Sequence, residues 1–239
     1  MTQRMDPKTY AAHWEHESTQ IEDQGSYKWL SSITPDGNVL EVGAGVGFGT
    51  ISLAATRPVL ALDSNADLIS KARARIASAG ANADVLATDF LAPSPEAIGR
   101  IQNFAPKVVV AWFVGSNADD QERHASDVPW LDRAKKYREN IEDAVVTLPL
   151  CQPSVEWVHL AVRAGSVSGF SDEAVKLSQR EDYDQYVFHP NGFEVTDVQI
   201  MSWERQGSQF GYQAAFNPNR APGPSEPVIL SIVAKRKVA

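Results

Sequence analysis

Residues 39–50 read VLEVGAGVGFGT, and this stretch decides the fold of the chain. An apolar strand leads into glycines at alternate positions, and an amphipathic segment follows at 51–56. Glycines in a strand-to-helix turn let the backbone pass close to a ligand. A dinucleotide fingerprint needs G-x-G-x-x-G, but its last position is Phe48 counted from Gly43 and Thr50 counted from Gly45. The turn therefore departs from that fingerprint, and a glycine-rich turn without a ligand is the alternative.

The pattern E-x-G-x-G-x-G resembles the first motif of the class I S-adenosylmethionine (SAM) methyltransferases. It begins at Glu41 and places glycines at Gly43, Gly45 and Gly47. The resemblance implies that SAM is the cofactor and that these glycines lie beside it. It also implies that Glu41, at the end of the strand, helps to organise the loop.

A second strand follows at the spacing that a nucleoside-binding site requires. Residues 58–63 read PVLALD and end in an acid that is twenty residues after Gly43. A carboxylate at this distance can reach the ribose hydroxyls of a bound nucleoside. We therefore predict that Asp63 binds the ribose, with Ser64 next to it in the same site. The helical pattern of Ala66–Ala79 then returns the chain to the sheet.

The third strand leads to a second acidic position. Ala83–Ala87 is followed by Thr88, Asp89 and Phe90, which resemble the adenine-contacting acid of the family and the apolar residue after it. A carboxylate can accept a hydrogen bond from the exocyclic amine of adenine. An exposed loop aspartate is the alternative, because aspartate is common in turns.

The fourth strand is predicted at 107–114, KVVVAWFV, a continuous apolar run typical of a strand covered on both faces. Its carboxyl end is expected to border the ligand crevice. Trp112 stands there and is predicted to contact the cofactor. A large aromatic residue of the core is the equally weighted alternative.

The second half of the chain completes the resemblance. The family's fold is α/β and Rossmann-like: a seven-stranded, mostly parallel sheet with an antiparallel last strand inserted between its neighbours and helices on both faces. The elements expected here are helices at 130–144 and 171–188 and strands at 155–163, from Phe193 onward and at 228–234.

We expect a helical cap segment at 1–34 and a SAM-dependent methyltransferase domain at 35–239. Residues 1–21 are polar, so neither a signal peptide nor a membrane span is expected there. The single cysteine, Cys151, excludes an internal disulfide and favours a cytoplasmic protein with a buried structural thiol. The prolines and the glycine of 217–227 predict a hairpin loop.

The charge balance of the chain indicates which class of molecule accepts the methyl group. Thirty acids and twenty-two bases give a net charge of −8, and the bases are scattered or confined to helix faces. Proteins that bind nucleic acid usually concentrate basic residues on one surface. The composition therefore predicts no nucleic-acid partner, and no helix combines a basic face with exposed apolar residues as membrane docking requires. A small molecule is the predicted partner.

Methyl transfer from SAM requires mainly that the acceptor atom be placed in line with the S–CH₃ bond. An acceptor that must lose a proton also benefits from a general base. His124 and His189 lie in segments expected near the crevice and are the predicted candidates, with ordinary surface histidines as the alternative. His159 lies within a strand and is predicted to be a packed core histidine.

Two segments are predicted to form the acceptor pocket. Residues 116–129 extend the connection after the fourth strand and are expected to be a loop that closes over the site. Related enzymes fold a segment such as 10–27 over the cofactor, and Tyr10 and Trp14 fall on one helical face of it. An ordinary docking stripe explains that spacing equally well.

The acids of 116–129 also raise the possibility of a Mg²⁺ site, because this ion prefers carboxylate oxygens. The metal-dependent catechol-type members of the family carry an Asp-Asn pair after the fifth strand, where this chain reads Arg163-Ala164-Gly165. We therefore expect no metal and interpret the acids as part of a solvated loop.

The leading hypothesis is a methyltransferase that acts on an O, N, S or C atom of a small molecule. Methylation of a protein or peptide is the alternative within enzymes. A non-catalytic partner subunit with the SAM fold is the alternative outside them, and a degraded motif would then be expected.

Overall fold

The structure, a computed structural model, describes residues 5–167, 171–205, 207–208, 210 and 225–237. Residues 217–224 of the loop predicted at 217–227 lie outside the described residues. The helices are α1 (Pro7–Asp23), α2 (Ser26–Ile33), α3 (Phe48–Ala54), α4 (Ala66–Ala79), α5 (Pro95–Phe104), α6 (Ala118–His124), α7 (Arg133–Ala144) and α8 (Asp172–Tyr183), with short 3₁₀ or π turns η1 (Trp130–Asp132), η2 (Asp184–Phe188) and η3 (His189–Asn191). The strands are β1 (Val39–Val42), β2 (Val59–Asp63), β3 (Ala83–Ala87), β4 (Val108–Trp112), β5 (Trp157–Val167), β6 (Phe193–Ser202) and β7 (Ser225–Arg236).

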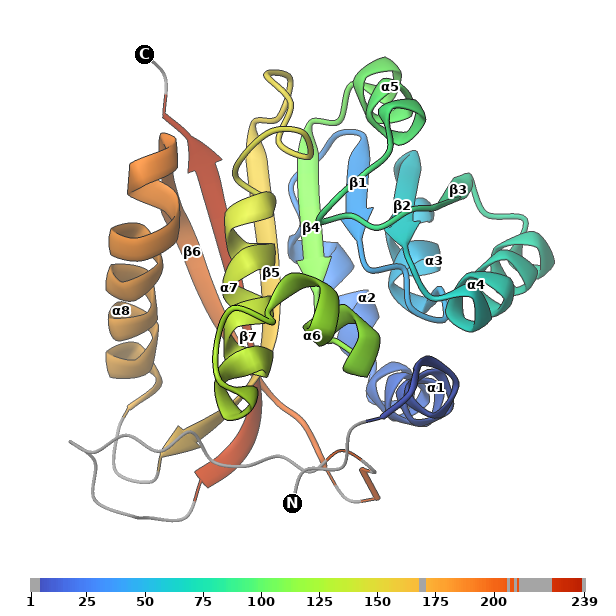
Figure 1. Cartoon of the computed structure of the whole chain (residues 1–239). Helices are drawn as coiled ribbons and strands as arrows, with labels where there is room; N and C mark the ends of the chain where they lie inside the picture. Colours follow the sequence, from blue (N-terminus) through green and yellow to red (C-terminus); the bar gives the residue numbers. More distant parts are fainter. Residues whose placement is uncertain (1–4, 168–170, 206, 209, 211–224, 238–239) are drawn as a thin grey trace.

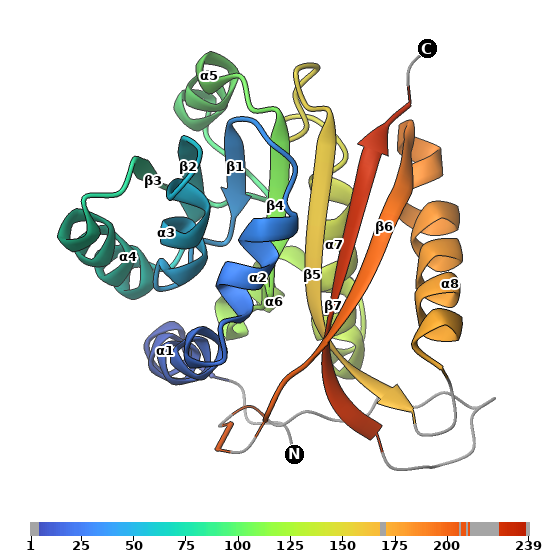
Figure 2. The same cartoon turned by 180° about the vertical axis from the view of Figure 1, so that it is seen from behind.

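The strands form one seven-stranded sheet in the order β3-β2-β1-β4-β5-β7-β6. β7 lies between β5 and β6 and is antiparallel to both, whereas the pairs among β1 to β5 are parallel. Helices cover both faces, with α7 and α8 in front in Figure 1 and α2 and α3 in front in Figure 2. The predicted architecture, including the inserted antiparallel last strand, is confirmed.

Two apolar cores lie on the two faces of the sheet. One contains residues of α5, α7 and η2, such as Ile101, Ile141 and Phe188, and the other contains residues of α1 to α4, such as Leu30 and Ile76. All residues of β1 and β4 are buried, because both faces of these central strands are covered. This double burial explains the continuous apolar runs in the sequence.

The helix α4 shows how local signals set the element bounds. The Asn65 side chain accepts hydrogen bonds from the backbone N–H groups of Asp67 and Leu68, at 3.0 and 3.2 Å. At the other end, Gly80 takes a left-handed conformation with φ +60°. An Asn N-cap and a left-handed Gly are the usual helix start and stop, so the predicted bounds are confirmed.

The segment 116–129 contains the helix α6 and is not a loop throughout, but Asp119, Glu122 and Asp127 are exposed, as predicted for the acids of this segment. The Asn117 side chain accepts from the backbone N–H groups of Asp119 and Asp120, and the Asp120 carboxylate accepts in return from the Asn117 N–H at 3.0 Å. This capping box starts the helix. Asp120 is thereby buried rather than solvated.

The two residues assigned to the core are confirmed there. His159 is fully buried, with its ring nitrogens 2.8 Å from the hydroxyls of Thr34 and Ser231, and burial lowers its pKa to about 3. Cys151 is buried as well, and burial raises the pKa of its thiol. Neither side chain is therefore placed or charged for catalysis.

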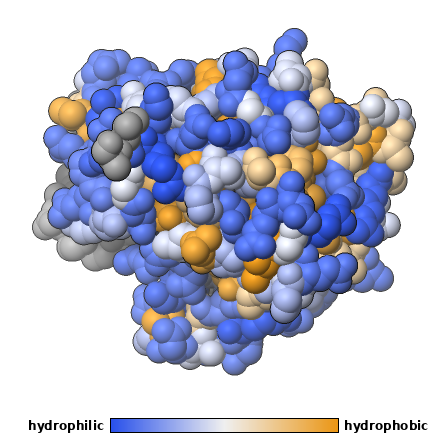
Figure 3. Space-filling view, turned by 90° about the horizontal axis from the view of Figure 1, so that it is seen from above, coloured by the Kyte–Doolittle hydropathy of each residue, from blue (hydrophilic) through white to orange (hydrophobic). Residues whose placement is uncertain are grey.

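The surface is mainly polar where it can be followed in Figure 3. That view looks down on the amino ends of the parallel strands, and hydrophilic residues cover most of the face with apolar residues between them. No helix within the described ranges combines the length and the apolar character that crossing a membrane requires.

Two helical glycines predict opposite responses to alanine. A Cβ on Gly49 of α3 would lie 2.8 Å from Glu41 Oε1 and 3.4 Å from the Trp112 ring, whereas a Cβ on Gly99 of α5 would have no neighbour within 4 Å. Alanine favours a helix over glycine by about 1 kcal/mol, but overpacking a buried contact costs about 1–3 kcal/mol. We expect Gly99→Ala to raise the melting temperature by about 2–4 °C and Gly49→Ala to lower it by a similar amount. Thermal unfolding of both variants tests this, and a stabilised Gly49→Ala would contradict the assigned contact.

Candidate functional site

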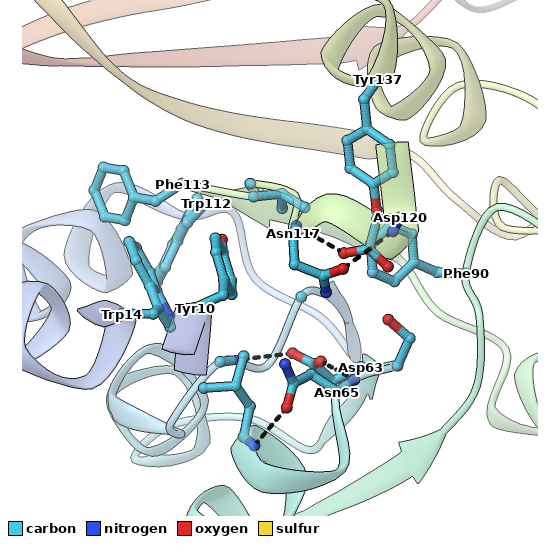
Figure 4. A pocket seen from close by; sticks show the side chains of 16 residues that line it. Tyr10, Trp14, Asp63, Asn65, Phe90, Trp112, Phe113, Asn117, Asp120 and Tyr137 are labelled. Atoms are coloured by element: carbon cyan, nitrogen blue, oxygen red, sulfur yellow. Dashed lines mark hydrogen bonds between the residues drawn. The ribbon is translucent and has the colours of Figure 1, made fainter. Parts of the chain in front are cut away.

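A pocket of about 420 Å³ lies at the carboxyl ends of β1, β2 and β4 (Figure 4). Eight of the predicted cofactor residues line it: Tyr10, Trp14, Gly43, Gly45, Asp63, Ser64, Phe90 and Trp112. The other lining residues were not expected from the sequence to form the cofactor site: Asn65, Leu68, Phe113, Val114, Gly115, Asn117, Asp120 and Tyr137.

The glycine turn after β1 adopts the conformation that only glycine takes without strain. Gly43, Gly45 and Gly47 have φ values of +83°, +55° and +91°. Gly43 and Gly45 face the pocket, but Gly47 is not among its lining residues. A Cβ on Gly47 would lie 3.0 Å from the Ala72 Cα, so this glycine allows α3 to pack closely on α4.

Asp63 joins two of the loops that form the pocket. Its Oδ2 accepts from the Gly45 N–H and its Oδ1 from the Asn65 N–H, both at 2.9 Å. Burial raises the pKa of Asp63 to about 6, although these hydrogen bonds act to lower it. Each carboxylate oxygen can accept more than one hydrogen bond, so Asp63 can hold the turn and still accept from a ligand.

Glu41 lies beneath the turn and does not line the pocket. It is buried, and its Oε2 accepts from the Thr50 hydroxyl at 2.6 Å. Burial raises the pKa of Glu41 to about 8. The bond to Thr50 ties the end of β1 to the start of α3, which agrees with the predicted role of organising the loop.

Asp89 is not brought to the pocket surface, although Phe90 beside it is. Its Oδ2 accepts from Arg123 at 3.0 Å and lies 2.8 Å from His124 Nε2, and its Oδ1 accepts from the Leu91 N–H. Burial acts to raise the pKa of Asp89, but the hydrogen bonds from His124 and Arg123 outweigh it and lower the pKa. In this structure Asp89 therefore anchors α6 to the loop after β3.

Neither predicted catalytic histidine is among the lining residues of this pocket. His124 is held by Asp89, as described above. His189 precedes β6, and the first residue of β6, Phe193, pairs with Arg236 of β7. The neighbouring Lys235 of β7 pairs with Trp157, the first residue of β5, so β6 begins beside the amino end of β5. His189 therefore lies at the edge of the sheet opposite to the pocket. A segment that leads into a strand parallel to β5 arrives at the amino edge. The prediction that His189 faces the crevice is therefore wrong.

Two aromatic residues at the end of β4 form a wall of the pocket. Trp112 lines it and also packs edge-on against His159, with ring centroids 5.3 Å apart, so it is a core aromatic, and its contact with the cofactor stays a prediction. Its buried indole N–H has no hydrogen-bond partner among the described residues. Phe113 has φ +57°, a strained value for a bulky residue, and its N–H donates to the Ala161 carbonyl at 2.8 Å. Strain of this kind concentrates at functional sites.

The helix α1 covers the pocket with two aromatic side chains, which point into it in Figure 4. Trp14 Nε1 lies 2.5 Å from the position that a Cβ on Gly45 would take, and the Tyr10 hydroxyl lies equally close to that of Gly115. An ion pair of 2.9 Å between Glu17 and Arg163 fixes α1 to β5. Tyr10 and Trp14 thus line the pocket, and the position of 10–27 over a bound cofactor stays a prediction.

A second pocket of about 680 Å³ lies between α7 and the ends of β4 and β5. It shares Phe113 and Val114 with the first pocket, so the two pockets are neighbours. Its other lining residues are Ala111, Arg138, Ile141, Glu142, Leu160, Ala161, Val162 and Arg163.

The sequence matches no protein-family model and no curated protein. The folded chain, however, resembles a protein from Pyrococcus horikoshii provisionally described as an RNA methyltransferase, with a TM-score of 0.51 over 89% of this chain and 82% of that one at 10% identity. This chain has the class I SAM-dependent methyltransferase fold.

Further structures with this fold differ in their acceptors. The precorrin-6y C5,15-methyltransferase of Geobacter metallireducens shares 16% identity over 90% of this chain and 87% of that one, with a TM-score of 0.46. The 23S rRNA methyltransferase ErmE shares 17% identity over 90% of this chain and 68% of that one, with a TM-score of 0.47. Identities this low relate the folds and not the substrates.

The expectation that nucleic acid is excluded as a partner is wrong. The Pyrococcus horikoshii protein, which has the same fold, is described as an RNA methyltransferase. Net charge averages over the whole surface, whereas binding depends on charge near the site. The helices α6 and α7, which each contribute lining residues to these pockets, also carry basic residues: Arg123, Arg133, Lys135, Lys136 and Arg138, of which Arg138 lines the second pocket.

The described residues contain no group of three or more His, Cys, Asp or Glu side chains placed to hold a metal ion. Two of the acids of 116–129 have partners within the protein: Asp120 closes the capping box, and Glu122 pairs with Arg133 at 2.5 Å.

Proposed function

We propose that this protein transfers a methyl group from SAM to a small-molecule acceptor. The observation that carries the proposal is the first pocket. It gathers the glycine turn after β1, Asp63 after β2, Phe90 after β3 and Trp112 after β4 at one edge of the sheet. This edge is where open α/β sheets bind their ligands.

The residues of the pocket fit SAM group by group. Asp63 would accept from the ribose hydroxyls, and Gly43 and Gly45 would allow close approach of the backbone. The Trp112 N–H, which is buried without a partner among the described residues, would gain an acceptor from the ligand. Phe90 supplies an apolar surface for the base. The bound cofactor supplies an electrophilic methyl group, so the residues of the chain need mainly to orient the acceptor and exclude water.

A small acceptor is favoured by the second pocket, which adjoins the first through Phe113 and Val114. The helix α1 also closes over the first pocket, as suits an enclosed reaction. A cytoplasmic location belongs to the proposal and is supported by the buried single cysteine.

Transfer of label from SAM carrying a labelled methyl group tests the proposal. Purified protein would be incubated with extracts of small metabolites, of protein and of RNA, each with and without a chelator. We expect label mainly in the metabolite fraction and no effect of the chelator, because Arg163-Ala164-Gly165 stands where the metal-dependent relatives carry an Asp-Asn pair. Label mainly in RNA or protein would replace the small-molecule acceptor. Activity lost on chelation and restored by Mg²⁺ would refute the metal-free mechanism, and SAM binding without transfer to any fraction would favour the non-catalytic alternative.

A further inference from the structure

The second pocket has an apolar body. Ile141 of α7 and Leu160 and Val162 of β5 line it, and all three belong to or pack against the core on this face of the sheet. A ligand here would therefore bury an apolar portion, such as a ring. The pocket adjoins the first one, so a molecule within it can present one atom to the cofactor.

The charged residues of the second pocket are unequally exposed. The Glu142 side chain is 17% exposed and accepts a hydrogen bond from the Tyr183 hydroxyl at 3.2 Å. The Arg138 side chain is 58% exposed, and its Nε lies 3.8 Å from Glu142 Oε1, which is an ion pair without a hydrogen bond. The third charged residue, Arg163, is held by Glu17 of α1, which packs on the other face of the sheet.

These charges select the polar group of a ligand. The Glu142 carboxylate would repel an anionic group placed beside it. The Arg138 guanidinium, whose Nε lies 3.8 Å from Glu142 Oε1, would repel a cationic group placed there. An uncharged hydroxyl avoids both conflicts and donates to the buried acceptor. Burial also raises the pKa of Glu142, which makes its carboxylate a stronger hydrogen-bond acceptor.

We propose that the second pocket binds the acceptor and selects an uncharged, mainly apolar hydroxyl compound, such as a phenol, whose hydroxyl donates to Glu142. That the bound compound is also the one that is methylated rests on the function proposed above. The binding preference itself is independent of that function and can be measured without any methyl transfer.

Three probes with the same naphthalene body isolate the polar group: 2-naphthol, 2-naphthoate and 2-naphthylmethylamine, which are neutral, anionic and cationic at pH 7. Their dissociation constants would be measured by saturation-transfer NMR with the full chain. We expect 2-naphthol to bind about tenfold or more tightly than either charged probe, because only its hydroxyl pairs with Glu142 without a charge conflict. Equal binding of the three probes, tighter binding of a charged probe, or no binding of 2-naphthol would overturn the proposal.

Variants then locate the probe. Ile141→Trp fills the pocket and is expected to abolish 2-naphthol binding, while Leu177→Trp places the same side chain at an exposed position of α8 and should not change it. Glu142→Gln keeps the shape and should weaken binding about fivefold, whereas Glu139→Gln, on the same helix at a more exposed position paired with Lys135, should leave it unchanged. If Ile141→Trp does not fold, Glu142→Gln decides, and unaltered binding there would overturn the proposal.

A calorimetric titration with S-adenosylhomocysteine keeps this inference separate from the proposed function. Failure of that titration would refute the cofactor assignment, whereas the probe preference alone decides the second pocket.

Discussion

Asp63→Ala is expected to weaken SAM binding about 100-fold while the protein remains folded. The carboxylate holds the Gly45 and Asn65 N–H groups, and in our proposal it also accepts from the ribose. Hydrogen bonds to a charged group contribute about 1.5–3 kcal/mol each, so losing the ribose contact alone accounts for much of the change. Isothermal titration calorimetry with SAM measures the effect, and circular dichroism verifies the fold.

Asp67→Ala is the matched control, since Asp67 is exposed in the first turn of α4 and does not line the pocket.

The pH dependence of SAM affinity tests the same assignment. Burial raises the pKa of Asp63 to about 6, and the ionised form is the better acceptor, so affinity should fall as the pH is lowered from 7 to 5. Asp63→Ala should lose this dependence. Unchanged affinity in Asp63→Ala would disprove the ribose assignment.

The features that could be predicted from the sequence are those that local chemistry determines. The positive φ values of Gly43 and Gly45 follow from a turn that other residues enter only with strain, and the bounds of α4 follow from Asn65 and Gly80. The place of β7 between β5 and β6 is different, because only the resemblance to a family implied it.

The features that the sequence does not reveal depend on residues that lie far apart along the chain. Asp89 has the spacing of a ligand contact, but Arg123 and His124 reach it from α6, and no local pattern records that approach. The position of His189 could not be predicted, because the edge of the sheet at which it lies depends on the direction of β6. The strained conformation of Phe113 likewise leaves no mark in the sequence, since its cause is the packing at the end of β4.

The buried glutamate beneath the glycine turn should make folding stability depend on pH. Burial raises the pKa of Glu41 to about 8, from an ordinary value of 4.5 in the unfolded chain. A raised carboxyl pKa contributes stability that is complete below the unfolded pKa and is lost as the pH rises through the folded pKa. Glu41→Gln removes this titration, and its amide oxygen can still accept from the Thr50 hydroxyl.

Between pH 5 and pH 9 we therefore expect the wild-type protein to lose about 4 kcal/mol of unfolding free energy relative to Glu41→Gln. Urea denaturation at pH 5, 7 and 9 measures the difference. Glu156→Gln is the control, because the hydrogen bond and ion pair with Lys107 lower the pKa of Glu156. This carboxyl therefore titrates below pH 5. The unfolding free energy of Glu156→Gln should change with pH in the same way as that of the wild type. If Glu41→Gln also ran parallel to the wild type, the carboxyl under the turn would not be the desolvated acid that its burial against Thr50 and α3 requires.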